Sequence, residues 1–162
     1  MTPAAWWRGE RGEGFVALQV VLIGLLAIGP RTLHGWPPWR FPEMPVVFVA
    51  GGFLLLTGLT LLVWGVLRLG SGLTPLPYPK AGAQLRETGP YRFVRHPMYG
   101  GVILLAFGWA LWVHGWLTLG YAGLAVVLLE VKVRREERWL TETYPAYDAY
   151  RRRVHKFIPF VY

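Results

Sequence analysis

The chain has 162 residues, of which 54% are hydrophobic and only 16% charged, and its formal net charge is +8. Soluble domains carry about 25% charged residues, so this composition excludes an ordinary soluble globule, and the length allows one domain, 1–162. The basic residues flank apolar runs, which favours anionic lipid headgroups over nucleic acid as their partners.

The first apolar run covers residues 15–28 and is short for a membrane span. Fourteen helical residues cover about 21 Å of a hydrocarbon core about 30 Å thick. The helix could extend to residue 33 or lie tilted against its neighbours. A cleaved signal peptide is the alternative, but Glu10 and Glu13 precede the apolar residues and no clean A-x-A site follows. We therefore expect an uncleaved helix.

The clearest transmembrane helix is the run 46–67, which has 22 uncharged residues. The segment before it, 30–45, has five prolines and two tryptophans and is typical of an interfacial loop. Glycines inside a span permit close packing of helices. The run contains four of them: Gly51, Gly52, Gly58 and Gly65.

Residues 68–97 form a polar stretch rich in glycine and proline, with no apolar period of its own. An irregular segment of this length in so small a protein is usually functional or disordered. The tyrosine, phenylalanine, leucine and arginine residues along it argue against disorder. We therefore expect a functional loop.

Residues 98–129 carry no formal charge apart from His114. One straight helix of that length would be about 48 Å long, which exceeds the hydrocarbon core. A break at 114–116 predicts two helices, 98–113 and 117–132, in a tight hairpin. The second helix is expected to continue into water beyond residue 132, followed by a basic amphipathic tail.

The sequence therefore predicts an all-α, polytopic integral membrane bundle of about four transmembrane helices, with a cytoplasmic loop and an amphipathic C-terminal helix. Two N-terminal spans occupy 1–67, and a core occupies 68–162. The N-terminal segment, the 68–97 loop and the tail hold fifteen of the seventeen lysines and arginines. The positive-inside rule places these three segments together on the cytoplasmic side.

The loop ends in a cluster of functional residue types. Arg95 and His96 precede Pro97, which favours the first turn of a helix. A helix N-terminus attracts anions, and Tyr91 and Tyr99 offer aromatic faces to a cation. The alternative is that Arg95 and His96 snorkel to the headgroups while the tyrosines form an aromatic belt.

A second cluster, Glu136 and Glu137, lies just beyond the last apolar turn. Glu136 could simply pair with Lys132 at i−4 on a solvated helix, or a carboxylate could hold the ammonium group of a ligand. Farther along, Tyr144, Tyr147 and Tyr150 recur every three residues before three arginines. This pattern is typical of an interfacial helix that binds anionic lipid.

Several chemistries lack their motifs. The sequence has no G-x-G-x-x-G after a strand, no G-x-S-x-G and no P-loop. It has no cysteine, and its four histidines are scattered. We expect no metal site and no nucleic-acid partner.

Three motifs together resemble a known family. The TGPYRFVRHPMYGG segment, the later EERWL and the terminal Y-x-x-Y-R-R-R-V with I-P-F resemble the isoprenylcysteine carboxyl methyltransferase family. That family shares a superfamily with the membrane phospholipid methyltransferases, and LTPLPYPKAGAQL looks like its bacterial branch. The resemblance covers about residues 68–160.

The resemblance implies an S-adenosylmethionine-dependent methyltransferase. Its cofactor contacts fall on Gln84, Leu85, Tyr91, His96, Pro97, Met98, Tyr99 and Glu136. Its catalytic group falls on Arg95, His96 and Glu136 or Glu137. The substrate-side arginine of the family is Lys132 or Val133 here, which puts a prenylcysteine carboxylate substrate in doubt.

From the residues alone, Arg95, His96 and the helix start suit the carboxylate of the cofactor, the glutamates its ammonium and the aromatic rings its sulfonium. We expect a methyl transfer to a lipid-borne or isoprenoid-like carboxylate, amine or hydroxyl, at the cytoplasmic face of a bacterial-type inner membrane. The partners are then a lipophilic acceptor and membrane lipids. The alternatives are a membrane reductase of the sterol-reductase type that uses NADPH, and a non-enzymatic lipid-binding protein.

Overall fold

The computed structural model describes residues 12–39, 44–79, 82 and 84–158, and these residues are all-α, as predicted. They form five α-helices, two short 3-10 helices and no strand: α2 Glu13–Ile28, α3 Met44–Leu69, α4 Pro97–Val113, α5 Trp116–Thr143 and α6 Tyr147–Arg153, with η1 Gly70–Gly72 and η2 Gly89–Arg92. The basic residues expected before α2, Arg8 and Arg11, and most of the terminal I-P-F motif lie outside the described residues.

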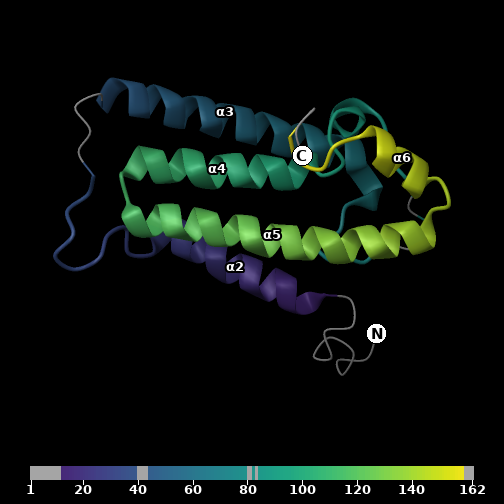
Figure 1. Cartoon of the computed structure of the whole chain (residues 1–162), viewed down its shortest axis with the longest axis horizontal. Helices are drawn as coiled ribbons and strands as arrows, with labels where there is room; N and C mark the ends of the chain where they lie inside the picture. Colours follow the sequence, from purple (N-terminus) through teal and green to yellow (C-terminus); the bar gives the residue numbers. More distant parts are fainter. Residues whose placement is uncertain (1–11, 40–43, 80–81, 83, 159–162) are drawn as a thin grey trace.

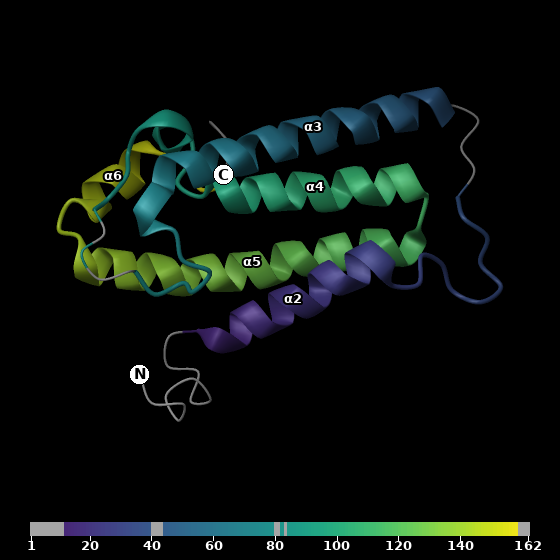
Figure 2. The same ribbon diagram turned by 180° about the vertical axis from the view of Figure 1, so that it is seen from behind.

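The four long helices lie side by side in the order α3, α4, α5, α2 (Figures 1 and 2). α3, α4 and α5 have nearly parallel axes, whereas α2 crosses α5 obliquely. The short connection between α4 and α5 lies at one end of the bundle. The opposite end carries α6, the 70–96 loop and the start of α4, and we refer to it as the polar end.

The predicted break is confirmed, because α4 ends at Val113 and α5 begins at Trp116. His114 adopts a left-handed conformation with φ of 53° and ends α4. α5 then runs for 28 residues, and its last turns lie at the polar end. The helix therefore does continue beyond its apolar part, as the sequence predicts.

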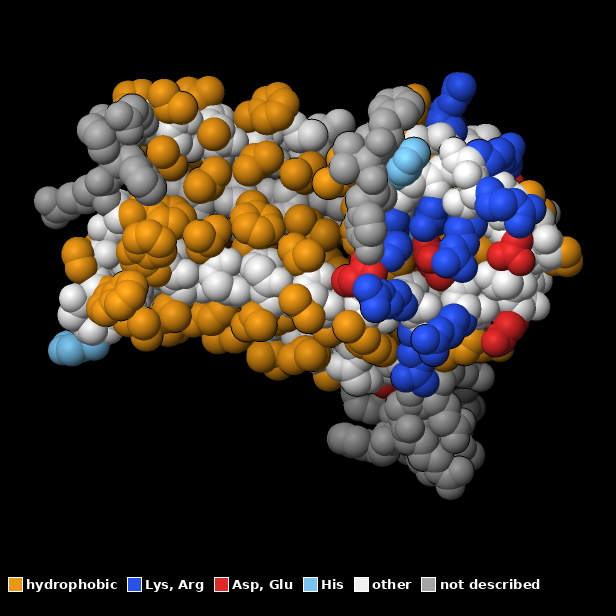
Figure 3. Space-filling model, viewed as in Figure 1, with side chains coloured by type: hydrophobic (Ala, Val, Ile, Leu, Met, Phe, Trp, Pro, Cys, Tyr) orange, Lys and Arg blue, Asp and Glu red, His pale blue; other side chains and the backbone are white. Residues whose placement is uncertain are grey.

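Two described helices, spanning Pro45–Leu69 and Trp116–Thr143, are long and apolar enough to cross a membrane. The other two apolar helices, α2 and α4, have 16 and 17 residues, or about 24 and 26 Å of helix. Many large apolar side chains lie on the outside of the bundle, such as Phe53, at 67% exposure, and Leu67, at 73%. Figure 3 shows this apolar surface ending where the lysine and arginine side chains begin.

Opposed glycines bring α3 and α4 into close contact. A Cβ atom on Gly58 would lie 2.7 Å from the carbonyl oxygen of Gly101, and one on Gly108 would lie 2.9 Å from that of Gly51. Side chains at these positions would force the backbones apart. The close helix packing expected from the glycines of the 46–67 run is therefore confirmed for Gly51 and Gly58.

Replacing Gly58 by valine is expected to lower the unfolding temperature of the detergent-purified protein by several degrees, because neither backbone can yield without separating α3 from α4. Thermal unfolding followed by size-exclusion chromatography measures the effect. Gly123→Val in α5 is the matched control, since a Cβ atom there would meet no other atom within 4 Å. Equal losses in the two variants would contradict the packing argument.

One expectation about the tail is wrong. α6 is amphipathic, but its tyrosines do not face lipid: Tyr147 is 1% exposed and Tyr150 is 2% exposed. The rings pack inward against the 70–96 loop and α5, while Arg151, Arg152 and Arg153 face outward. The three-residue spacing correctly predicts that the rings share one face, but it does not say whether lipid or protein covers that face.

Candidate active site

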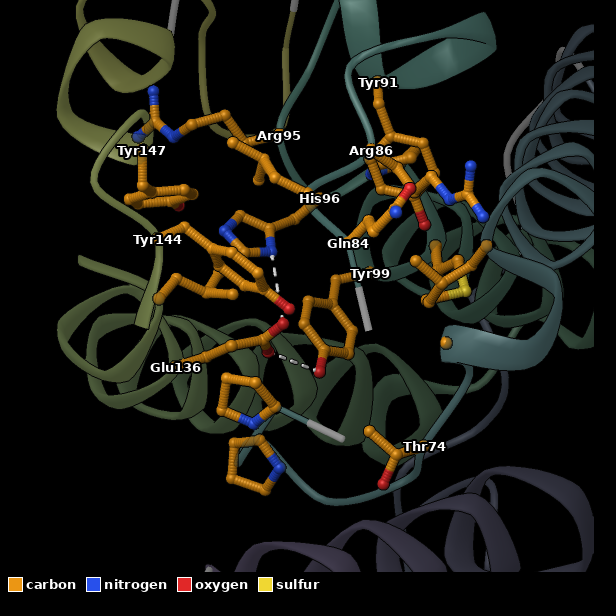
Figure 4. Close-up of a pocket in the computed structure, with 18 of the residues that line it drawn as sticks. Thr74, Gln84, Arg86, Tyr91, Arg95, His96, Tyr99, Glu136, Tyr144 and Tyr147 are labelled. Atoms are coloured by element: carbon orange, nitrogen blue, oxygen red, sulfur yellow. Dashed lines mark hydrogen bonds and ion pairs between the residues drawn. The ribbon is translucent and has the colours of Figure 1, made fainter. Parts of the chain in front are cut away.

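A pocket opens at the polar end of the bundle, between the 70–96 loop, the start of α4, the last turns of α5 and α6 (Figure 4). Its space, including the part open to solvent, is about 820 Å³. The lining residues are Leu69, Gly72, Thr74, Leu76, Pro77, Tyr78, Pro79, Gln84, Leu85, Arg86, Tyr91, Arg95, His96, Pro97, Met98, Tyr99, Glu136, Leu140, Tyr144, Tyr147 and Tyr150.

The tail holds the end of the loop in place through backbone hydrogen bonds. The Arg95 N–H donates to the His155 carbonyl at 2.8 Å, and the His96 N–H donates to the Lys156 carbonyl at 3.1 Å. Val94 and His155 form an isolated parallel bridge. The sequence expectation that the loop and the tail face each other is confirmed, and this pairing fixes His96 at the start of α4.

Two tyrosines connect the loop to the tail and to α3. The Tyr150 hydroxyl donates to the Tyr91 carbonyl at 2.6 Å, and the Tyr91 hydroxyl donates to the Gly65 carbonyl at 3.4 Å. Burial raises the pKa of both phenols, and nearby carboxylates add to the effect. Both hydroxyls therefore stay protonated and act as donors at any ordinary pH.

Tyr150→Phe is expected to destabilise the fold by about 1–3 kcal/mol, because it leaves the buried Tyr91 carbonyl without this donor. Tyr147→Phe is the matched control. Tyr147 is equally buried, and its hydroxyl has no hydrogen-bond partner among the described residues. Its removal should leave stability unchanged or raised. Chemical denaturation of both variants in detergent measures the difference, and equal losses would contradict the assigned hydrogen bond.

Arg95 is a structural connector rather than a snorkelling side chain. Its Nε donates to Glu137 Oε1 at 2.9 Å, and its Nη1 donates to the carbonyls of Arg151, at 3.1 Å, and Val154. Its side chain is only 10% exposed. The guanidinium lines the pocket while it is engaged with α5 and the tail.

The two adjacent glutamates have different surroundings. Glu136 lines the pocket, and its Oε2 accepts a hydrogen bond from the Tyr99 hydroxyl at 2.8 Å. Glu137 does not line the pocket and instead pairs with Arg95 and His96. The choice that the sequence left open therefore has a geometric basis, with Glu136 as the carboxylate that a ligand can reach.

His96 lies between the two carboxylates. Its Nε2 is 3.1 Å from Glu137 Oε1, and its Nδ1 is 4.0 Å from Glu136 Oε1. A carboxylate only accepts hydrogen bonds, so Nε2 carries the proton toward Glu137. In the neutral imidazole, Nδ1 is then the basic nitrogen on the side of Glu136. The ring also stacks on Tyr99, with centroids 5.7 Å apart.

Lys132 does not pair with Glu136 on a solvated helix, which was one of the two alternatives. It is 2% exposed, and its Nζ donates to Gln19 Oε1 at 2.8 Å and to the Pro75 carbonyl at 3.1 Å. The ammonium also lies 5.1 Å from the centroid of the Tyr99 ring. Lys132 thus ties α2 and the loop to α5 directly beside the pocket.

All the catalytic and cofactor-binding residues predicted from the sequence line this pocket, with the exception of Glu137. The wall formed by residues 74–79, Arg86 and the tyrosines of the tail was not predicted. The run LTPLPYP offered a signal, since its prolines and tyrosine lie shortly before Gln84. The tyrosine repeat offered another, but the sequence pattern alone favours a lipid-facing role for it.

The described residues define a class: an all-helical protein with two helices long and apolar enough to cross a membrane and a pocket at its polar end. The family model for phospholipid methyltransferases matches residues 46–147, which is more than half of the chain. The chain belongs to this family. The predicted membership of the wider membrane methyltransferase superfamily is thereby confirmed.

A curated relative carries a different activity in its name. The chain is 27% identical over 124 residues to the steroid 5-alpha-reductase DET2 of Gossypium hirsutum. The match covers 76% of this chain but only 43% of that relative, so the chain spans less than half of the length of the relative. The family match favours a methyltransferase over a reductase.

Proposed function

We propose that the pocket binds S-adenosylmethionine and that the protein transfers the methyl group to a lipid-borne acceptor. The observation that carries the proposal is the convergence of His96, Tyr99 and Glu136, from the start of α4 and the last turns of α5, on one pocket at the polar end. The family match supports the reaction class.

The pocket suits the charges of this cofactor. Glu136 presents a carboxylate to an ammonium group, and the Tyr99 hydroxyl fixes its orientation. The rings of Tyr91 and Tyr144 supply aromatic faces against which a sulfonium can lie. Arg86 is an exposed guanidinium on the pocket wall that pairs with no carboxylate among the described residues, so it suits the carboxylate of the cofactor.

S-adenosylmethionine, when bound, supplies a methyl group on a positively charged sulfur. An acceptor would attack the methyl carbon in line with the carbon–sulfur bond, and S-adenosylhomocysteine would leave. The protein then has mainly to position the partners. A carboxylate acceptor needs no base. An amine or hydroxyl acceptor must lose a proton, and His96 Nδ1 is the group in the pocket placed to take it.

The nature of the acceptor follows from the surroundings of the pocket. The position of the substrate-side arginine falls on Lys132 or Val133. Val133 carries no charge, and the Lys132 ammonium already donates to Gln19 Oε1 and the Pro75 carbonyl. It is therefore poorly placed to hold a prenylcysteine carboxylate. We propose an uncharged or zwitterionic lipid-borne amine or hydroxyl, with the isoprenylcysteine type of substrate as the less favoured case.

We also propose four membrane spans, with the pocket on the cytoplasmic side. α2 and α4 are short, and their lengths of about 24 and 26 Å match a hydrocarbon core of about 30 Å if flanking residues complete the crossing. The concentration of lysine and arginine in the loop and the tail supports this orientation.

Binding calorimetry on the detergent-purified protein tests the function. Saturable binding of S-adenosylhomocysteine, followed by radiolabelled methyl transfer into a total lipid extract, is the expected result. Saturable binding of NADPH instead would support the reductase suggested by the DET2 match. If folded protein binds neither, the enzymatic proposal fails and a lipid-binding protein takes its place.

A further inference from the structure

We propose that the outer side of the polar end holds a binding site for the headgroup of an anionic phospholipid, separate from the pocket. A depression there is lined by residues 151–156 of the tail and by Arg95. The lining contains three consecutive arginines and Lys156, and we call it the basic depression. It is distinct from the methyl-transfer site, since of the described residues Arg95 alone lines both.

The charges of the described residues around the basic depression are unbalanced. Glu137 is shared by Arg95 and Arg151, and Glu130 is shared by Lys156 and Arg134. Arg153 pairs with Glu87. Arg152 is exposed and forms no ion pair with a described residue. These ion pairs use three carboxylates for five cations, Arg152 adds a sixth cation, and the surplus of positive charge attracts an anion.

The exposed arginines of the basic depression can bind a ligand while they keep their carboxylate partners. The side chains of Arg151 and Arg153 are 53% and 62% exposed, and the Arg151 guanidinium is 3.8 Å from Glu137, a distance at which the pair is loose. Exposed pairs of this kind are weak. The oxygens of a phosphate can accept hydrogen bonds from two guanidinium groups at once. Such a phosphate would have to replace only these weak ion pairs.

An apolar stripe next to the basic depression indicates a lipid rather than a free phosphate. The Lys156 ammonium reaches Glu130 on α5 at 2.7 Å. Leu124, Val127 and Val131 have exposures of 56%, 61% and 50%, and their spacing of three and four residues places them on one face of α5 near Glu130. Acyl chains can cover this stripe while the phosphate lies among the arginines above it.

The surface view agrees with this arrangement. Figure 3 shows lysine and arginine side chains gathered over the polar end, directly beside the apolar surface of the bundle. An anionic lipid fits such a boundary, since each basic residue near an anionic surface strengthens attachment. A zwitterionic lipid would bring its own cation to the arginines and should bind less well.

A lipid titration in neutral detergent tests the site without any cofactor or methyl transfer. We expect dioleoyl phosphatidylglycerol to raise the unfolding temperature and to remain bound in native mass spectrometry more than dioleoyl phosphatidylcholine. Arg152→Gln should weaken apparent phosphatidylglycerol binding about fivefold. The matched control is Arg138→Gln, which removes the same charge from an exposed position of α5 outside the basic depression.

Each other outcome of the titration has a definite meaning. Equal stabilisation by the two lipids, or equal weakening in Arg152→Gln and Arg138→Gln, would overturn the proposal, because binding would then depend on net charge alone. The same stabilisation by inorganic phosphate, without lipid, would also overturn it in favour of a free anion. Loss of S-adenosylhomocysteine binding with intact phosphatidylglycerol selectivity would instead remove the proposed function and leave this site standing.

Discussion

Glu136→Gln is expected to weaken the binding of S-adenosylhomocysteine about 10- to 100-fold, the largest effect on the pocket of any single conservative change. The reason is that the substitution removes a charge while keeping shape, and charged hydrogen bonds contribute about 1.5–3 kcal/mol. The fold should survive, because glutamine can still accept the hydrogen bond from the Tyr99 hydroxyl. Calorimetry at fixed pH measures the affinity.

Two control variants make this expectation specific. Glu142→Gln removes the same charge from an exposed position farther along α5 and should bind as the parent does. Glu137→Gln should act on stability instead, because Glu137 does not itself line the pocket and pairs with Arg95 and His96. Unchanged affinity in Glu136→Gln, together with lost affinity in a folded Glu137→Gln protein, would reverse the roles assigned to the two carboxylates.

The helices could be predicted well because their physical signals are local. Twenty-two uncharged residues before Arg68 leave few alternatives to a buried or lipid-covered helix, and α3 covers them all. His114 and Gly115 interrupt an apolar run too long for one span, and the chain turns there. The glycines of the 46–67 run also predict close helix packing from a local pattern. That pattern does not predict which helix packs against them.

The site could be predicted only in part, because its remaining features depend on contacts distant in sequence. Glu136 and Glu137 are adjacent and chemically identical, and residues some forty positions earlier separate their environments: Arg95 pairs with Glu137, whereas the Tyr99 hydroxyl donates to Glu136. The same holds for Lys132, which reaches Gln19 and Pro75 rather than its neighbour on the helix. No periodicity in the sequence encodes these partners.

The sequence of the tail predicts a helical face of tyrosines but not what covers that face. A helical face of tyrosines with arginines opposite is equally compatible with a protein-covered and a lipid-covered face. The pairing of the tail with the loop end decides the matter, because it buries Tyr150 against the Tyr91 carbonyl. What remains exposed is the arginine face, and this is why the expected attraction to anionic lipid moves from the aromatic side of α6 to the basic depression.

Arg95→Met is expected to produce the largest loss of stability, and to release α6 before the rest of the bundle unfolds. The substitution leaves the buried Glu137 carboxylate without its closest cation and removes the donor to two tail carbonyls, those of Arg151 and Val154. Breaking a buried pair on one side costs about 3–5 kcal/mol. Arg95→Lys should restore only part of the lost stability, since one ammonium group cannot reproduce the planar set of N–H donors of a guanidinium.

Limited trypsin digestion reports the release directly, because α6 ends in three arginines whose backbone is protected while the tail stays paired with the loop. We expect cleavage at 151–153 to accelerate at least tenfold in Arg95→Met, before any cleavage in α3 or α4. Arg92→Met is the matched control, since that side chain is exposed and lies over the Phe93 ring, away from the tail carbonyls. If the two variants were cut at the same rate, α6 would be held by its buried tyrosines and backbone pairing alone, and Arg95 would have to be assigned to the ligand.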